Sequence, residues 1–300
     1  MAIYKNKKIL ALFLLPAVIL VVFLIFLPVL LNIYYSFFKW TAYSKTMDFV
    51  GLKYYQKLFT DGEVWHAFLN NVKYAVVSLI FQVGLGLVIA HILNVVASRR
   101  FATATRVIIF IPAVISLTAI GLLWVIAYSP SIGFINPLLE KIGLGAFAHD
   151  WLGDSKTAMW AIIMVSQWQY TGEMVMLYTV GLQNVPTEIY ESAKIDGANS
   201  VQSFFKITIP MIKSTILMNT TVTIIGAFMV FDEVYVMTSG GPGKSTEVLA
   251  TTMYETGFRM DNMGYASSIG VLLFAITFIF SFIELRLYNV KETMKGGGKS

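Results

Sequence analysis

Six long apolar segments run through this chain, and they limit it to one class of fold. A membrane-spanning helix needs roughly 20 mostly apolar residues at about 1.5 Å per residue, and each segment is long enough. The segments cover residues 9–31, 72–97, 106–128, 157–181, 215–237 and 265–287. We therefore predict an all-α membrane protein with six transmembrane helices in a single domain over residues 1–300.

The composition leads to the same class. Hydrophobic residues make up 57% of the chain and charged residues only 13%, against about 25% charged residues in soluble domains. The first segment follows Lys5, Lys7 and Lys8 like a secretory signal, but its apolar run exceeds the usual 7–15 or so residues, which predicts a retained helix. The chain has no cysteine, which excludes disulfides and thiolate sites.

The basic residues indicate an orientation, because Lys and Arg gather in cytoplasmic loops. An N-terminus on the inside places 13 of the 22 basic residues there, including the short loop with Arg99, Arg100 and Arg106. Six helices then put both termini in the cytoplasm, together with the loop between the fourth and fifth segments. We predict a multi-pass protein of the bacterial inner membrane, with a flexible tail at residues 296–300.

That loop, residues 186–212, contains a polar stretch from Glu191 to Pro210. We predict a helix that ends at Gly197 in the left-handed conformation, followed by a second helix with Ser200 as its N-cap. The second helix carries four residues at helical spacing on one stripe: Val201, Phe204, Phe205 and Thr208. Pro210 then constrains the entry into the next helix.

The residues of this stretch read Glu-x-Ala-x-x-Asp-Gly-Ala, then Phe, then Ile-Thr-Ile-Pro. This order resembles the EAA motif of bacterial ABC importer permeases, in its sugar-permease form. Ser192 and Ile209 depart from the motif by replacing its usual alanine and leucine. The resemblance extends to Gly240-Gly241-Pro242 and to most of the chain, where it is similar to the MalF-like subunit rather than its MalG-like partner.

The resemblance implies a fold, partners and a coupling site. The fold is that of a MetI-like, type I ABC importer permease. The implied partners are a second, MalG-like permease, two cytoplasmic ABC ATPase subunits, an extracytoplasmic sugar-binding protein and the membrane lipid. The residues expected to couple to the ATPases match the motif: Glu191, Ala193, Asp196, Gly197, Ala198, Phe204 and Pro210.

The chain itself shows no catalytic set and no cofactor or metal site. Residues 238–245 resemble a P-loop, but Thr238 stands where that motif requires glycine and no strand precedes it. ATP and Mg are therefore expected on the partner ATPases. His91 lacks Asp, Glu or Cys neighbours, which favours a packed, hydrogen-bonded histidine over a metal ligand.

Polar residues inside the apolar segments mark a candidate substrate path. Glu173 and the pair Asp232-Glu233 are costly in lipid, so we expect them to face a cavity or a partner, or to be buried in hydrogen bonds. Ordinary helix packing is the alternative for the remaining polar and small residues. The candidate path residues are Ala113, Leu117, Ser166, Gln169, Tyr170, Glu173, Asn219, Thr223, Gly226, Ala227 and Val230.

The membrane midsections contain no Lys or Arg, and this favours a neutral substrate, for which Tyr170 and Trp168 offer stacking faces. The rival to an ATP-driven sugar importer is an ion-coupled secondary sugar carrier. A carrier would need inverted repeats or broken helices around a charged site, and the sequence shows no convincing repeat.

Overall fold

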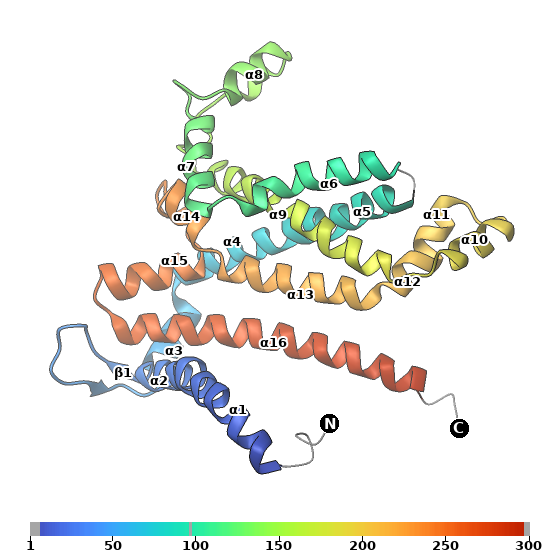
Figure 1. Cartoon of the computed structure of the whole chain (residues 1–300). Helices are drawn as coiled ribbons and strands as arrows, with labels where there is room; N and C mark the ends of the chain where they lie inside the picture. Colours follow the sequence, from blue (N-terminus) through green and yellow to red (C-terminus); the bar gives the residue numbers. More distant parts are fainter. Residues whose placement is uncertain (1–6, 96–97, 297–300) are drawn as a thin grey trace. The chain divides into compact units, whose positions relative to one another are not determined.

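The computed structural model describes residues 7–95 and 98–296, so Lys5 of the N-terminal basic cluster and tail residues 297–300 lie outside the described residues. The described chain is mainly helical and divides into two compact units (Figure 1). One unit comprises Met1–Gly62 and Thr252–Phe274, and the other comprises Glu63–Thr251 and Ala275–Ser300.

The first unit begins with a long apolar helix. Helix α1 (Lys7–Val21), the wider π-helical turn η2 (Val22–Phe26) and α2 (Leu27–Tyr35) follow one another directly. Strands β1 (Phe38–Lys39) and β2 (Asp48–Phe49) pair antiparallel with Phe38 opposite Phe49, and α3 (Lys53–Thr60) follows them. The stretch Leu12–Tyr35 is apolar enough to cross a membrane and none of its residues is buried, as expected of a helix that faces lipid or a partner.

The same unit also contains a later stretch of chain. This stretch holds the end of α15 (Leu249–Tyr254), the π-helical turn η6 (Glu255–Arg259) and the start of α16 (Met263–Gly296). The Asn32 amide donates to the Ser267 carbonyl at 3.2 Å, and the Tyr265 hydroxyl donates to the Asp61 carboxylate at 2.7 Å. These bonds connect α2 and the end of α3 to α16.

The second unit contains the candidate sites. It opens with α4 (Gly62–Ser78), the π-helical turn η3 (Leu79–Leu85) and α5 (Gly86–Val95), which form one long helix. Helices α6 (Arg99–Val114), α7 (Leu117–Tyr128) and α8 (Ile135–Lys141) follow, then a 3-10 turn η4 (Gly145–Phe147). Helix α9 (Ala158–Gln183) is next, and its buried face places it at the centre of the unit's core.

The remaining elements come in quick succession after α9. They are α10 (Thr187–Ile195), α11 (Ser200–Ser203), the π-helical turn η5 (Phe204–Thr208), α12 (Ile209–Met211), α13 (Lys213–Met229) and α14 (Asp232–Met237). In Figure 1, α10 and α11 project from the end of the unit where α5 and α9 finish.

Two predicted spans differ from the structure in the same way. The segment predicted over 106–128 is two helices, α6 and α7, which meet at 95°. Pro112 removes one hydrogen bond from the last turn of α6, and Ile115 and Ser116 then take extended backbone. The segment predicted over 215–237 ends its helix at Met229 and restarts at Asp232, and α13 itself meets the preceding helix at 75°.

Within the described residues, three helices are long and apolar enough to cross a membrane, or up to five if each of two bent pairs counts as one span. Helix α9 is not among them, because Ser166, Gln167, Gln169 and Glu173 lower its mean hydropathy. This polar helix is nevertheless deeply packed. A Cβ on Gly172 would overlap the carbonyl of Ile109, so the glycine allows α6 and α9 to approach closely.

Candidate functional site

The loop between α9 and α13 folds as a helix, a sharp break and a second helix. Gly197 has φ +81°, the left-handed conformation that the sequence predicts for it. The Ala198 amide donates to the Ala193 carbonyl at 2.9 Å and the Gly197 amide to the Lys194 carbonyl at 3.2 Å. This pair of bonds is a Schellman motif, which satisfies the last carbonyl groups of α10 and fixes the direction in which the chain leaves it.

The second helix starts one residue earlier than predicted. Ser200 was predicted as its N-cap and this was wrong: Asn199 is the N-cap. The Asn199 side chain accepts from the Gln202 amide at 2.8 Å, and the Gln202 side chain accepts from the Asn199 amide at 3.0 Å. A capping box needs Glu or Gln three residues after the N-cap, and Gln202 stands at that distance from Asn199 but not from Ser200. The reciprocal bonds of this box therefore set the first residue of the helix.

The predicted apolar stripe of this second helix divides into two faces. Thr208 is fully buried and Phe204 packs on the His91 ring, whereas Val201 is 65% exposed and Phe205 61% exposed. Residues 204–208 form a wider π-helical turn, which changes the spacing on which the stripe was predicted. The loop therefore has one anchored face and one apolar, outward face.

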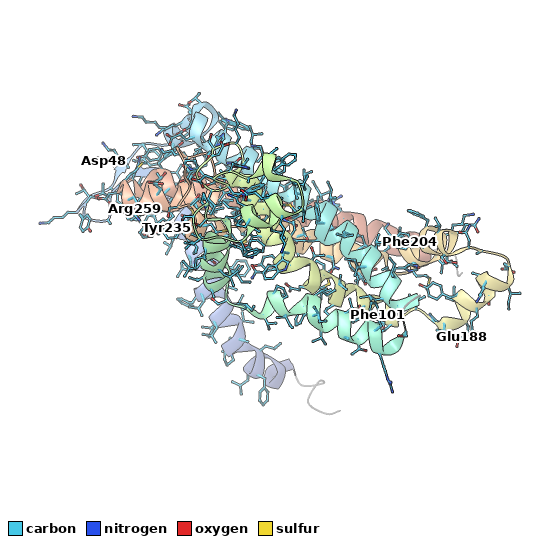
Figure 2. All side chains as sticks on the ribbon, turned by 90° about the horizontal axis from the view of Figure 1, so that it is seen from above. Asp48, Phe101, Glu188, Phe204, Tyr235 and Arg259 are labelled. Atoms are coloured by element: carbon cyan, nitrogen blue, oxygen red, sulfur yellow. The ribbon has the colours of Figure 1, made fainter. Side chains whose placement is uncertain are left out.

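The outward face is suited to binding another protein. Two further apolar residues of the loop are exposed: Ile195 at 86% and Met211 at 49%. Figure 2 shows Glu188 and Phe204 together at the end of the unit where this loop projects. Glu191 is exposed and forms no ion pair with any residue that the structure describes. Glu191 lines the cavity that this loop forms with the end of α5. Exposed apolar side chains gathered on one loop are typical of an interaction surface.

A cavity of about 290 Å³ lies among α4, α9 and α13. Most of the predicted substrate-path residues line it: Leu117, Ser166, Tyr170, Glu173, Thr223, Gly226, Ala227 and Val230. The other three do not. Gln169 and Asn219 are each 1% exposed and packed inside the unit, and Ala113 is half-buried at the end of α6.

Carboxylates and a broken helix form one side of this cavity. Glu173, Asp232 and Glu233 all line it, as expected of intramembrane carboxylates, and all three lie close enough to the Tyr170 hydroxyl to act on it electrostatically. Glu233 is 7% exposed and accepts from Tyr74 at 3.4 Å. The backbone is non-helical at Val230 and Phe231, which a membrane protein tolerates where the chain borders a cavity.

One wall of the cavity consists of residues that were not predicted from the sequence. Tyr74, Ser78 and Gln82 line it from the long helix of α4 and η3. Gln82 donates to Gln167 at 3.0 Å, and Gln167 donates to Ser78 at 3.2 Å. The signal was present, because the three polar residues recur every four positions and so share one helix face. Trp168, in contrast, packs edge-on against Trp124 and does not line the cavity.

Two buried asparagines attach α13 and the segment that follows α14 to α4. Asn71 donates to the Ala227 carbonyl at 2.8 Å and accepts from the Leu249 amide at 2.9 Å, and Asn70 donates to the Ser245 carbonyl at 2.9 Å. The P-loop-like residues 238–245 are therefore held in this packed connection. Asn71 also fixes the end of α13 just before the helix breaks at the cavity.

His91 is hydrogen-bonded, as its sequence surroundings predict. Its Nδ1 lies 3.3 Å from the hydroxyl of Thr208, and it is 7% exposed. Among the described residues, no group of three or more His, Cys, Asp or Glu side chains is arranged to hold a metal ion.

Comparisons with known proteins assign the chain to a family. Residues 82–289 match the family model described as binding-protein-dependent transport system inner membrane component. The chain is 42% identical to the probable ABC transporter permease protein YurN of Bacillus subtilis, over 95% of this chain and 97% of that protein. It is 30% identical to the trehalose/maltose transport system permease protein MalF of Thermococcus litoralis, over 95% of each chain.

A solved structure shows the same fold. A chain in the crystal structure of a bacterial alginate ABC transporter, in complex with an alginate pentasaccharide-bound periplasmic protein, superposes with a TM-score of 0.80. The match covers 93% of both chains at 23% identity. The broken helix beside carboxylates would also suit a carrier, but the family decides between the two classes. The chain belongs to the family of binding-protein-dependent transport system inner membrane components.

Proposed function

We propose that this chain is a membrane-spanning permease subunit of an ATP-driven sugar importer. A second, MalG-like permease completes the path, two ABC ATPases supply the energy and an extracytoplasmic binding protein delivers the sugar. The family assignment supports this proposal, as do the names of its relatives, among them a trehalose/maltose permease. The observation that carries it is the anchored loop Glu191–Pro210, whose outward apolar face is left without a partner in the described chain.

The loop is the proposed coupling element. Its Schellman turn and capping box make a compact knob, and its exposed face places Glu191, Ile195 and Phe205 where an ATPase can reach them. Of the other predicted coupling residues, Asp196 and Gly197 form the turn, and Phe204 anchors it through His91. ATP and Mg bind to the ATPases, so this chain needs no cofactor of its own.

Six spans are proposed, with both termini in the cytoplasm. The three apolar helices, the bent pair of α6 and α7, and helix α13 account for five spans, and the polar but deeply packed α9 is the sixth. This count puts the loop of residues 186–212 and the short basic loop near Arg100 on the cytoplasmic side, in agreement with the positive-inside rule.

The cavity of about 290 Å³ is the proposed substrate path through this subunit. Hydroxyl, amide and carboxylate groups line it beside the Tyr170 ring, and these groups bind sugar hydroxyls. No Lys or Arg is among its lining residues, so the cavity favours a neutral sugar over an anionic one.

The coupling proposal is tested with variants of the loop. Gly197→Val places a branched residue at φ +81° and strains the turn by roughly 1–3 kcal/mol, whereas Gly197→Asn tolerates that conformation. We expect Gly197→Val and Glu191→Lys to lower the amount of ATPase that copurifies with the permease pair, and Gly197→Asn to retain it. Parental retention in both Gly197→Val and Glu191→Lys would show that the loop does not couple.

A further inference from the structure

Three elements of the second unit meet at one buried hydroxyl group. The Thr208 hydroxyl lies 3.0 Å from the Tyr190 hydroxyl and 3.3 Å from His91 Nδ1. Tyr190 belongs to α10, Thr208 to η5 and His91 to α5. The two halves of the loop are therefore joined to each other and to the long helix through a single side chain.

The chemistry of this chain of groups favours a fixed geometry. A threonine hydroxyl donates one hydrogen bond and accepts others, so Thr208 can serve both neighbours at once. Thr208 is fully buried and His91 is 7% exposed, and water does not compete for bonds in such a site. The His91 ring also packs against Phe204, with 4.9 Å between the ring centroids, which limits its rotation.

The hydrogen bonds of Thr208 with Tyr190 and His91 border a second cavity. Its volume is about 670 Å³, and it is lined by His91 and Asn94 of α5 on one side and by Tyr190, Lys194 and Ser203 of the loop on the other. This cavity separates part of the loop from the end of α5. Elsewhere Tyr190, Phe204 and Ile209 of the loop pack on the apolar core that contains Leu87, Ala90 and Leu93 of α5.

The long helix connects this link to the substrate cavity. His91 lies nine residues beyond Gln82, or about 14 Å along a helix. Gln82, Ser78 and Tyr74 line the cavity of about 290 Å³ from the same continuous helix. A displacement of the loop that is carried into α5 therefore reaches a wall of that cavity directly.

We propose that Tyr190, Thr208 and His91 are positioning residues that make the coupling loop and the long helix move as one body. The proposal rests on the proposed function, because it takes this loop as the element that the ATPase moves. The loop is also connected to the unit through the chain, which continues into α9 and α13, and through the apolar packing of Phe204 and Ile209. The hydroxyl link adds directed hydrogen bonds to the long helix, whose Tyr74, Ser78 and Gln82 line the cavity and which the loop does not adjoin in sequence.

The absence of cysteine from the chain allows a direct test by spin labelling. Ile92→Cys on α5 and Glu188→Cys on α10 place the labels at exposed positions outside the proposed docking face. The assembled importer, with partner subunits made free of cysteine, is reconstituted in lipid nanodiscs. The distance distribution between the two labels is measured without nucleotide and after trapping with MgATP and vanadate.

We expect one narrow distance peak that is the same in both states, because the loop and α5 move together. Thr208→Val keeps the shape of the side chain but loses the hydroxyl, and we expect the peak to be lost in favour of a broad distribution in the trapped state. Thr208→Ser should restore the narrow peak. The matched control is Thr220→Val, because the Thr220 hydroxyl bonds within its own helix, to the Ile216 carbonyl at 2.8 Å.

A second variant keeps the test decisive if Thr208→Val does not assemble. His91→Phe retains a ring beside Phe204 but removes Nδ1, so it should give the same broad distribution. An unchanged narrow peak in the variants would overturn the proposal, and so would a parental distance that differs between the two states. Failure of the parental importer to bind its ATPase or hydrolyse ATP would instead contradict the proposed function, so the two failures are distinguishable.

Discussion

At the scale of single residues, the cavity depends on a few polar side chains of α9. Tyr170 and Glu173 line it together with Asp232 and Glu233 of α14. A hydrogen bond to a charged group contributes about 1.5–3 kcal/mol, and about 1.4 kcal/mol is a factor of ten. We therefore expect Glu173→Gln and Tyr170→Ala each to lower sugar uptake roughly tenfold or more.

The measurement is the initial rate of uptake of the sugar that copurifies with the companion binding protein, in vesicles with equal amounts of assembled importer. Glu140→Gln is the matched control, since Glu140 is an exposed carboxylate of α8 that does not line the cavity. If both cavity variants assemble and transport at the parental rate, these side chains serve only in packing.

Asn71 is the residue whose loss should most disturb the wall of the cavity. It is fully buried and its side chain bonds to the Ala227 carbonyl and the Leu249 amide. Asn71→Leu leaves these backbone groups without hydrogen-bond partners, and each unsatisfied group lowers the free energy of unfolding by about 1–3 kcal/mol. We expect a lower midpoint of thermal unfolding of the detergent-solubilised permease pair. Asn184→Ala, which removes an exposed bond within one helix, should leave the midpoint close to the parental value.

At the scale of elements, the contact between α6 and α9 is set by Gly172. Any larger side chain there would meet the Ile109 carbonyl, so Gly172→Ala must push the two helices apart. The matched variant is Gly226→Ala on α13, where a Cβ would meet no atom within 4 Å. We expect Gly172→Ala to lower the unfolding midpoint and Gly226→Ala to keep or raise it, because alanine is the better helix former. Equal midpoints would contradict the packing described for Gly172.

The elements also show which features the sequence can and cannot reveal. Hydropathy predicts the long apolar helices. The turn at Gly197 could also be predicted, because glycine adopts the left-handed backbone conformation found there at no steric cost. The breaks after Val114 and Met229 were not predicted, because apolar residues continue through them and hydropathy does not register a change of direction. The cavity wall at Tyr74, Ser78 and Gln82 was missed because these residues were not read as one face.

At the scale of the whole molecule, the described residues combine exposed apolar helices, a polar cavity and the proposed docking loop. The central claim is that the energy comes from ATP hydrolysis on partner subunits and not from an ion gradient. Family membership and the anchored loop support this claim together. This energy source does not depend on the number of membrane spans or on the orientation of the termini.

The most direct measurement is uptake of the binding protein's sugar by proteoliposomes that hold the complete importer and enclose MgATP, with and without a protonophore. We expect uptake to persist when the protonophore abolishes the proton gradient and to stop when ATP is replaced by a non-hydrolysable analogue. Uptake that collapses with the gradient while internal ATP remains high would contradict it.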